Sequence, residues 1–301
     1  MIGLLLVLSS ISLAKSTTRS QIIMGTIATI SLEDKSYIQK GFSLLKEVEH
    51  ALSSYDKTAK LYKLNQQKII YHDKHLLEVL QKSKYFYKLT HGYFDISIGS
   101  VTKEVYHFGE EQASDLKALQ RAKIDIKAFT ITDTKVTLER GITLDLGGIG
   151  KGYGVDVVSD YYHDKNITHG KVALSGDIRC LNLCEFSIQS PFEKGKTILT
   201  FSSKIPNLSI STSGTYERFK KSKELHHLIN PKTKKQGQAF VSVTIMIEAD
   251  NTQADALATA VSVMPKEEAL QFLLEQDVGF ILVEPDKTRW SANLEKFVIS
   301  K

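Results

Sequence analysis

A glycine-rich segment, Leu144–Asp156, has the sequence LDLGGIGKGYGVD and contains five glycines within eight residues. A turn of this composition that opens a helix lets backbone N–H groups approach a phosphate closely, and Lys151 adds a positive charge. The segment is not a P-loop, because Gly152 follows Lys151 where Ser or Thr is required, and its glycine spacing does not match G-x-G-x-x-G. Taken alone, a phosphate-binding turn and a plain structural turn both remain open.

A second segment, Ala254–Val261, reads ADALATAV. Asp255 and Thr259 are four residues apart, so a helix places both on one face. A carboxylate and a hydroxyl are hard oxygen donors that suit Mg2+, which keeps water and phosphate oxygens as its other ligands. The alternative is that Asp255 forms a cap or an ion pair and Thr259 packs.

A third segment, His226–Thr233, reads HHLINPKT. A histidine before a turn can act as a base, donate to a phosphate or remain a satisfied surface residue. Ser211–Gly214, STSG, is likewise either a phosphate cradle or an ordinary turn. Neither segment decides the chemistry by itself.

The elements that position these segments are predicted from periodicity. We expect helices at 36–54, 76–89, 115–122, 254–264 and 266–275, and a further helix after the glycine-rich turn, within 145–162. We expect strands at 20–32 with a turn at Met24-Gly25-Thr26, and at 129–138, 142–144, 171–173, 186–189, 197–201, 208–211, 241–247, 279–283 and near 297, with a polar connection at 55–65. Strands and helices come in blocks, which predicts an α+β fold of mixed or antiparallel sheets packed with helices.

Composition and the chain ends limit the class of protein. The 301 residues carry a net charge of +5 without long runs of like charge, so we expect no nucleic-acid partner. The pattern of residues 1–15 predicts an export signal, with small residues before Lys15. No later stretch is apolar enough to span a membrane. We expect residues 16–301 to form a single unit, or two closely packed subdomains, without a lipid anchor. Cys180 and Cys184 form either a disulfide or two buried thiols.

Eight segments in order resemble the FAD:protein FMN transferases, the ApbE family. They are MGT at 24, SSYDKTAKLYKLN at 53, GYFDISIGS at 92, DLGGIGKGYGVD at 145, SGDIR at 175, STSGTYERF at 211, HLINP at 227 and ADALATA at 254. The resemblance implies an FAD cleft between subdomains. It also implies a periplasmic enzyme that moves FMN from FAD to a Thr or Ser hydroxyl of an acceptor flavoprotein and releases AMP.

The resemblance also implies roles for individual residues. The FAD-binding residues are expected to be Met24, Tyr55, Tyr93, Phe94, Asp95, Asp145, Lys151, His227 and Ile229. The metal, Mg2+, is expected to bind Asp255, Thr259 and the carbonyl of Gly148. His227 is the preferred general base or orienting residue, with Asp145 as the alternative.

Several positions depart from the family pattern. Asn230 stands where Asp is usual, Lys234 follows Thr233 where Gly is usual, and Gly150 and Gly154 stand where Ala is common. Two other functions share these motifs. One is an Mg2+-dependent FAD pyrophosphatase that yields FMN and AMP, and the other is a periplasmic flavin-binding protein without turnover.

Overall fold

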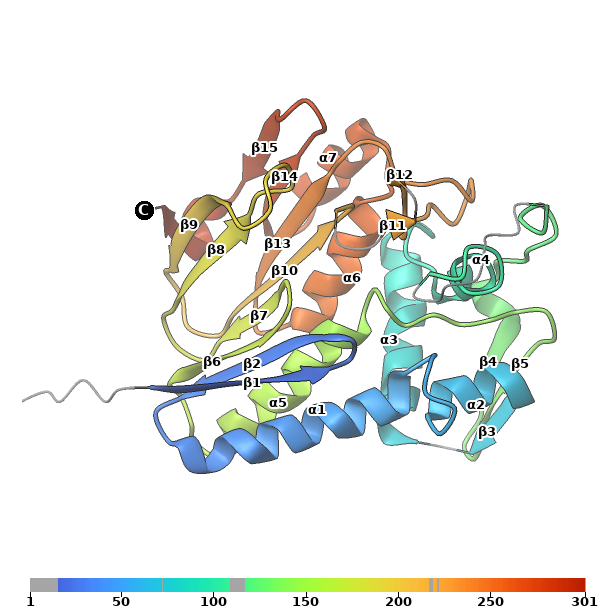
Figure 1. Ribbon diagram of the computed structural model, residues 1–301, viewed down its shortest axis with the longest axis horizontal. Helices are drawn as coiled ribbons and strands as arrows, with labels where there is room; N and C mark the ends of the chain where they lie inside the picture. Colours follow the sequence, from blue (N-terminus) through green and yellow to red (C-terminus); the bar gives the residue numbers. More distant parts are fainter. Residues whose placement is uncertain (1–15, 72, 109–116, 217–218, 221, 301) are drawn as a thin grey trace, which may run out of the picture.

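The computed structural model describes residues 16–71, 73–108, 117–216, 219–220 and 222–300. Its centre is an eight-stranded sheet in which every neighbouring pair is antiparallel. In spatial order the strands are β1 (Thr17–Ile23), β2 (Thr26–Leu32), β6 (Gly170–Leu174), β7 (Asp177–Cys180), β10 (Leu208–Gly214), β13 (Ser242–Glu248), β14 (Gly279–Val283) and β15 (Arg289–Ala292). Figure 1 shows this sheet running from the blue hairpin to the red C-terminal strands.

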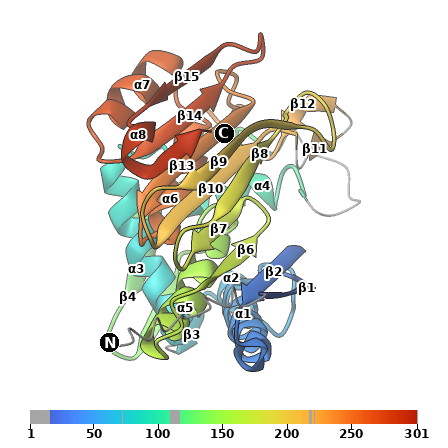
Figure 2. The ribbon, with the colours of Figure 1, turned by 90° about the vertical axis from the view of Figure 1, so that its left-hand side faces the viewer.

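Three helices pack against the sheet and against one another. They are α1 (Ile38–Leu52), α5 (Gly150–Asp164) and α6 (Asn251–Val261), with α5 against β6 and β7, and α6 against β10 and β13. Figure 2 shows them on one side of the strands. The apolar spacing of α1 buries Phe42, Leu45 and Val48 completely. Most of α6 consists of small or apolar buried residues, which lets the sheet and α5 approach it closely.

A smaller part of the molecule lies beside this layer. It contains α2 (Lys60–Gln67), α3 (Lys74–Leu89), α4 (Gly99–Thr102) and a three-stranded sheet of β3 (Ile69–Tyr71), β5 (Lys135–Leu138) and β4 (Phe129–Ile131). One hydrophobic cluster runs through both parts, from Leu61 and Leu80 to Ile245 and Leu257. The glycine-rich segment therefore passes between two parts that share a core.

The remaining elements complete the C-terminal half. A three-stranded sheet contains β8 (Glu185–Gln189), β9 (Thr197–Ser203) and β16 (Val298–Ser300), and a short hairpin contains β11 (Phe219–Lys220) and β12 (Ser222–His226). The last helices are α7 (Lys266–Leu274) and α8 (Leu294–Phe297). Cys180 and Cys184 form a disulfide at the end of β7. Of the two alternatives left open by the sequence, the disulfide is therefore the one found.

The predicted fold class is confirmed: helices pack on antiparallel sheets. The predicted turn at Met24-Gly25 is also confirmed, since it joins β1 to β2 with positive φ at both residues, as a type I′ hairpin turn requires. The helices predicted at 36–54, 76–89, 254–264 and 266–275 are found as α1, α3, α6 and α7, with small shifts of their ends. The helix predicted after the glycine-rich turn is α5.

Other predictions were wrong. Residues 60–67 form a helix where a polar connection was expected, and residues 142–144 form no strand. Residues 117–121 form turns and residue 122 is irregular, so the predicted helix is not found there. Residues 115–116 and the predicted signal at 1–15 lie outside the described residues. By contrast, the last strand predicted near Phe297 is found as β16, which begins at Val298 directly after the short helix α8. Within the part of the chain that the structure describes, no helix is long and apolar enough to cross a bilayer.

Candidate active site

Helices α5 and α6 approach each other closely at Gly152. A Cβ added there lies 2.2 Å from the carbonyl oxygen of Asn251 and 2.7 Å from Cβ of Asp255, so only glycine fits. One turn further along α5, the carboxylate of Asp156 accepts hydrogen bonds from the backbone N–H groups of Asn251 (2.8 Å) and Thr252 (2.7 Å). This anion at the first turn of α6 fixes that helix on α5.

The predicted metal residues come together at this crossing. Asp255 is 1% exposed, and the hydroxyl of Thr259 lies 3.3 Å from the carbonyl oxygen of Gly148. A Cβ on Gly148 meets Thr259 at 2.8 Å, so glycine is required for this approach also. A carboxylate, a hydroxyl and a carbonyl form a hard oxygen donor set that fits Mg2+.

No group of three or more His, Cys, Asp or Glu side chains suited to a metal occurs among the described residues. A site built from Asp255, Thr259 and the Gly148 carbonyl has only one such side chain. That composition suits a cation that takes its other ligands from water and phosphate, rather than one fully enclosed by protein.

Lys151 lies between two buried carboxylates. Its ammonium is 2.9 Å from Oδ2 of Asp177 and 3.3 Å from both carboxylate oxygens of Asp255. Oδ2 of Asp255 also accepts a hydrogen bond from the backbone N–H of Gly152 at 3.0 Å. Burial, and then the charge of Asp255, raise the pKa of Asp177 to about 7, against the opposing effect of Lys151.

Sequence reasoning missed Asp177 as a site residue. It belongs to the SGDIR segment that was matched as a motif, but no role was assigned to it. The available signal was a carboxylate directly after the Ser175-Gly176 turn, at the first position of a strand whose other residues are mostly buried. Its contact with Lys151 depends on the packing of β7 against α5, which spacing alone does not show.

A second polar cluster surrounds Asp145, three residues before Gly148. Its carboxylate accepts hydrogen bonds from the hydroxyl of Thr102 (2.7 Å) and from the N–H of Gly147 (3.0 Å), and lies 3.6 Å from the ammonium of Lys103. That ammonium also lies 3.7 Å from the ring centroid of Tyr55 and contacts its hydroxyl. The structure thus joins two predicted residues, Asp145 and Tyr55, through Lys103, which sequence reasoning missed.

Met24 occupies the hairpin turn between β1 and β2. Its N–H donates to the carboxylate of Glu49 at 2.6 Å, and its φ is +55°. The end of its side chain lies 3.3 Å from a Cβ placed on Gly150 and 3.6 Å from one placed on Gly154. Met24 therefore contacts the start of α5, beside the glycine-rich turn.

Tyr93, Phe94 and Asp95 were predicted to line the nucleotide pocket, and the structure gives each a local contact. The Tyr93 hydroxyl donates to Glu268 at 2.6 Å, and burial raises the pKa of this hydroxyl to about 12. Phe94 is 3% exposed and packs in the hydrophobic core. The carboxylate of Asp95 caps the following turn through the N–H and hydroxyl of Ser97.

His227 and Ile229 follow β12. His227 is half-buried, while Ile229 is 5% exposed and packs with Val101 and Tyr106. The neighbouring Asn230 explains one departure from the family pattern. Its amide donates to the carbonyl of Val263 at 2.8 Å, which an ionised carboxylate cannot do.

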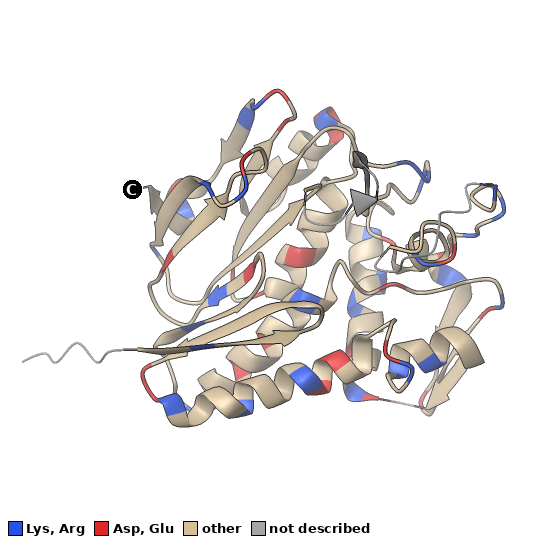
Figure 3. Cartoon of the chain, viewed as in Figure 1, with Lys and Arg blue, Asp and Glu red and all other residues tan. Residues whose placement is uncertain are grey.

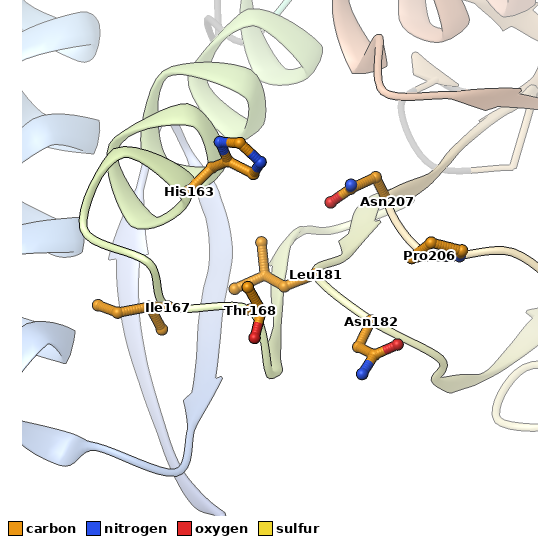
Figure 4. Close-up of a pocket in the computed structure, with 7 residues that line it drawn as sticks. All are labelled: His163, Ile167, Thr168, Leu181, Asn182, Pro206 and Asn207. Atoms are coloured by element: carbon orange, nitrogen blue, oxygen red, sulfur yellow. The ribbon is translucent and has the colours of Figure 1, made fainter.

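A cavity of about 180 Å³ lies elsewhere, at the C-terminal end of α5 (Figure 4). His163 and Thr168 line it together with Leu181 and Asn207. His163 is twelve residues from Lys151 on the same helix, which corresponds to about 18 Å. The cavity is smaller than the roughly 300 Å³ of typical organic-ligand sites, so we do not assign FAD to it.

Basic and acidic residues are interspersed along the chain (Figure 3), and the absence of a nucleic-acid partner stays a prediction. The fold and the site define an α+β protein suited to a hard divalent cation together with a phosphate-containing ligand. Residues 24–282 match the model of the ApbE family, and the chain belongs to that family.

Individual relatives agree with this assignment. A Treponema pallidum protein named FAD:protein FMN transferase is 26% identical, with 90% of this chain and 85% of that protein covered. A Vibrio cholerae protein of the same name is 28% identical over 80% and 77% of the two chains. The solved flavin transferase ApbE from Vibrio cholerae has a TM-score of 0.81 at 23% identity, covering 94% of this chain and 99% of that chain. An ApbE protein from Thermotoga maritima has a TM-score of 0.84 at 20% identity, covering 94% and 98%.

Proposed function

We propose that this protein is an FAD:protein FMN transferase: it transfers the FMN half of FAD to a Thr or Ser hydroxyl of an acceptor flavoprotein and releases AMP. The observation that carries the proposal is the crossing of α5 and α6. There the hydroxyl of Thr259 lies 3.3 Å from the carbonyl oxygen of Gly148, and Asp255, on the same helix, contacts Lys151 and the N–H of Gly152. Family membership and the names of the relatives support the same reaction.

The chain's own residues account for binding and orientation. Asp255, Thr259 and the Gly148 carbonyl would hold Mg2+, which neutralises charge on pyrophosphate oxygens when bound. Lys151 supplies a second positive charge at the same place, and the start of α5 points its N–H groups towards an anion. Met24 lies beside Gly150 and Gly154, and Tyr55 is linked to Asp145 through Lys103; we place the flavin near these two residues.

The transfer is a displacement at the FMN phosphorus. The acceptor hydroxyl oxygen forms a bond to this phosphorus, and the bond from phosphorus to the bridging pyrophosphate oxygen breaks, so that AMP leaves with that oxygen. The hydroxyl proton passes to a base, for which we propose His227, with Asp145 as the alternative. His227→Ala is expected to abolish transfer while FAD binding persists. Normal transfer by that variant assigns the role to another group.

Location is part of the proposal. We propose export to the periplasm, directed by residues 1–15. The Cys180–Cys184 disulfide supports this location, because disulfides persist in oxidising compartments.

The decisive experiment is mass spectrometry of a Thr-containing acceptor flavoprotein incubated with this protein, FAD and Mg2+. We expect a mass gain that matches an esterified FMN, which disappears with EDTA and with Asp255→Ala. Metal-dependent release of FMN and AMP without acceptor modification would instead identify an FAD pyrophosphatase. FAD that is bound and unchanged with several acceptors would identify a flavin-binding protein.

A further inference from the structure

One ammonium group serves two buried carboxylates at the crossing of α5, α6 and β7. Lys151 contacts Asp177 at 2.9 Å and both oxygens of Asp255 at 3.3 Å. Asp177 and Asp255 are each 1% exposed. The cluster contains two negative charges and one positive charge, so its net charge is negative. A net charge is energetically unfavourable in a site shielded from water.

The other contacts of the two carboxylates differ. Oδ1 of Asp177 accepts a hydrogen bond from the hydroxyl of Ser211 at 2.6 Å, and Ser211 is itself 1% exposed. Asp255 accepts from the N–H of Gly152. Asp177 is therefore held by the sheet, whereas Asp255 lies on the helix that also carries Thr259.

Lys151 and a divalent cation compete for the same carboxylate. In the structure the ammonium lies at equal distances from the two oxygens of Asp255, which is the position that a cation bound to this carboxylate would take. A divalent cation bound to Asp255 repels the ammonium. The nearest alternative partner is Asp177, which is already 0.4 Å closer to Lys151 than Asp255 is, the difference between 3.3 and 2.9 Å.

We propose that Asp177 is a positioning residue for Lys151: it holds the ammonium when Asp255 binds the metal, so that lysine and metal stand side by side at the pyrophosphate. The inference rests on the metal site of the proposed function. Without Asp177, Lys151 pairs with Asp255 alone and occupies the place of the metal. Asp177 thus strengthens metal binding although it is not a ligand.

The test measures Mg2+ affinity by calorimetric titration of the full protein without FAD or acceptor. Asp177→Asn is expected to weaken Mg2+ binding by about tenfold, because Lys151 then neutralises Asp255. Lys151→Met is expected to bind Mg2+ at least as tightly as the wild type. The double variant Asp177→Asn/Lys151→Met has the wild-type net charge at the site, and we expect its affinity to return to within about threefold of the wild type.

Ser211→Ala is the matched control, because it removes the hydrogen bond to Asp177 and keeps both charges. We expect it to bind Mg2+ within about threefold of the wild type. Circular dichroism and thermal unfolding establish that each variant is folded. The proposal is overturned if Asp177→Asn binds Mg2+ as the wild type does, if the double variant stays as weak as Asp177→Asn, or if Ser211→Ala is equally weakened.

The same titration separates the two proposals. If the wild type binds Mg2+ and Asp255→Ala does not, the proposed metal site is supported, and the Asp177 variants then test only the positioning role of Asp177. If the wild type and Asp255→Ala give the same titration, the metal site of the proposed function is wrong, and the role of Asp177 fails with it.

Discussion

Gly152→Ala tests whether the approach of α5 to α6 builds the site. The added Cβ lies 2.7 Å from Cβ of Asp255 and 2.2 Å from the carbonyl oxygen of Asn251. Carbon atoms in contact are normally 3.5–4.0 Å apart, so α6 must move from α5 by about 1 Å. Both obstructing atoms belong to the backbone or lie next to it, so no side-chain rotation relieves the clash.

The magnitude follows from two opposing effects. Overpacking of this severity destabilises the folded protein by about 3 kcal/mol, whereas replacing glycine by alanine within a helix stabilises it by about 1 kcal/mol. We therefore expect the free energy of unfolding to fall by about 2 kcal/mol. A shift of about 1 Å also separates Asp255 and Thr259 from the Gly148 carbonyl, which we expect to lower kcat/KM for FMN transfer by about 100-fold.

Gly154→Ala is the matched control on the same helix. A Cβ there meets only flexible side chains, those of Leu45 at 3.3 Å, Met24 at 3.6 Å and Leu174 at 3.8 Å. We expect this variant to be as stable as the wild type or up to about 1 kcal/mol more stable. Urea unfolding and the acceptor assay measure both effects. Equal stability and full transfer in Gly152→Ala, or equal damage by Gly154→Ala, would refute the reasoning.

Three further predictions concern stability. Burial raises the pKa of Asp156 from its ordinary 3.8 to about 6. Its native carboxyl therefore holds a proton that the unfolded chain has lost, and stability falls by about 3 kcal/mol as pH rises from about 4 to 6. In urea unfolding measured across pH, Asp156→Asn should lack this fall in stability. If the variant shows the same fall as the wild type, Asp156 is not its cause. Asn230→Asp loses the hydrogen-bond donor to Val263, so thermal melts should show that the free energy of unfolding falls by about 1–3 kcal/mol at pH 7. This loss of stability should shrink below pH 5, where the protonated carboxyl can donate. A loss that does not depend on pH would exclude the missing donor as its cause. Removing the disulfide with Cys180→Ala/Cys184→Ala should lower the free energy of unfolding by about 2 kcal/mol, as expected for so short a loop, and reductant should then have no effect; continued sensitivity to reductant would refute it.

The sequence predicted what depends on local periodicity. The helix α1 follows directly from the spacing of its buried residues, and the Met24-Gly25 turn follows from a glycine between two alternating strands. The strand predicted at 142–144 failed for a physical reason. Most of its backbone hydrogen bonds go to side chains, since Asn65 pairs with both the N–H and the carbonyl of Leu144 and Ser100 accepts from the N–H of Thr143. Alternating burial therefore arises there without a partner strand.

The site itself was predictable only in part. Thr259 approaches Gly148, because the glycine-rich turn and the small residues of α6 allow close packing, while the metal role of Gly148, Asp255 and Thr259 stays a prediction. Lys103 and Asp177 escaped prediction, because each acquires its role from an element distant in sequence. The roles of Tyr93, Phe94, Asp95, His227 and Ile229 towards FAD stay predictions.

The glycine-rich segment connects three elements at regular intervals. Asp145 is held by Thr102 of α4, Gly148 by Thr259 of α6, and Lys151 by Asp177 of β7, so a contact to a different element follows every three residues. A pyrophosphate and its metal bound along this segment would add contacts to all three at once. Because such contacts exist only in the native state, ligand binding must stabilise the whole arrangement, by about 2.7 kcal/mol at a ligand concentration 100 times Kd. An increase in the unfolding midpoint that requires FAD and Mg2+ together, and that Asp255→Ala abolishes, is therefore expected.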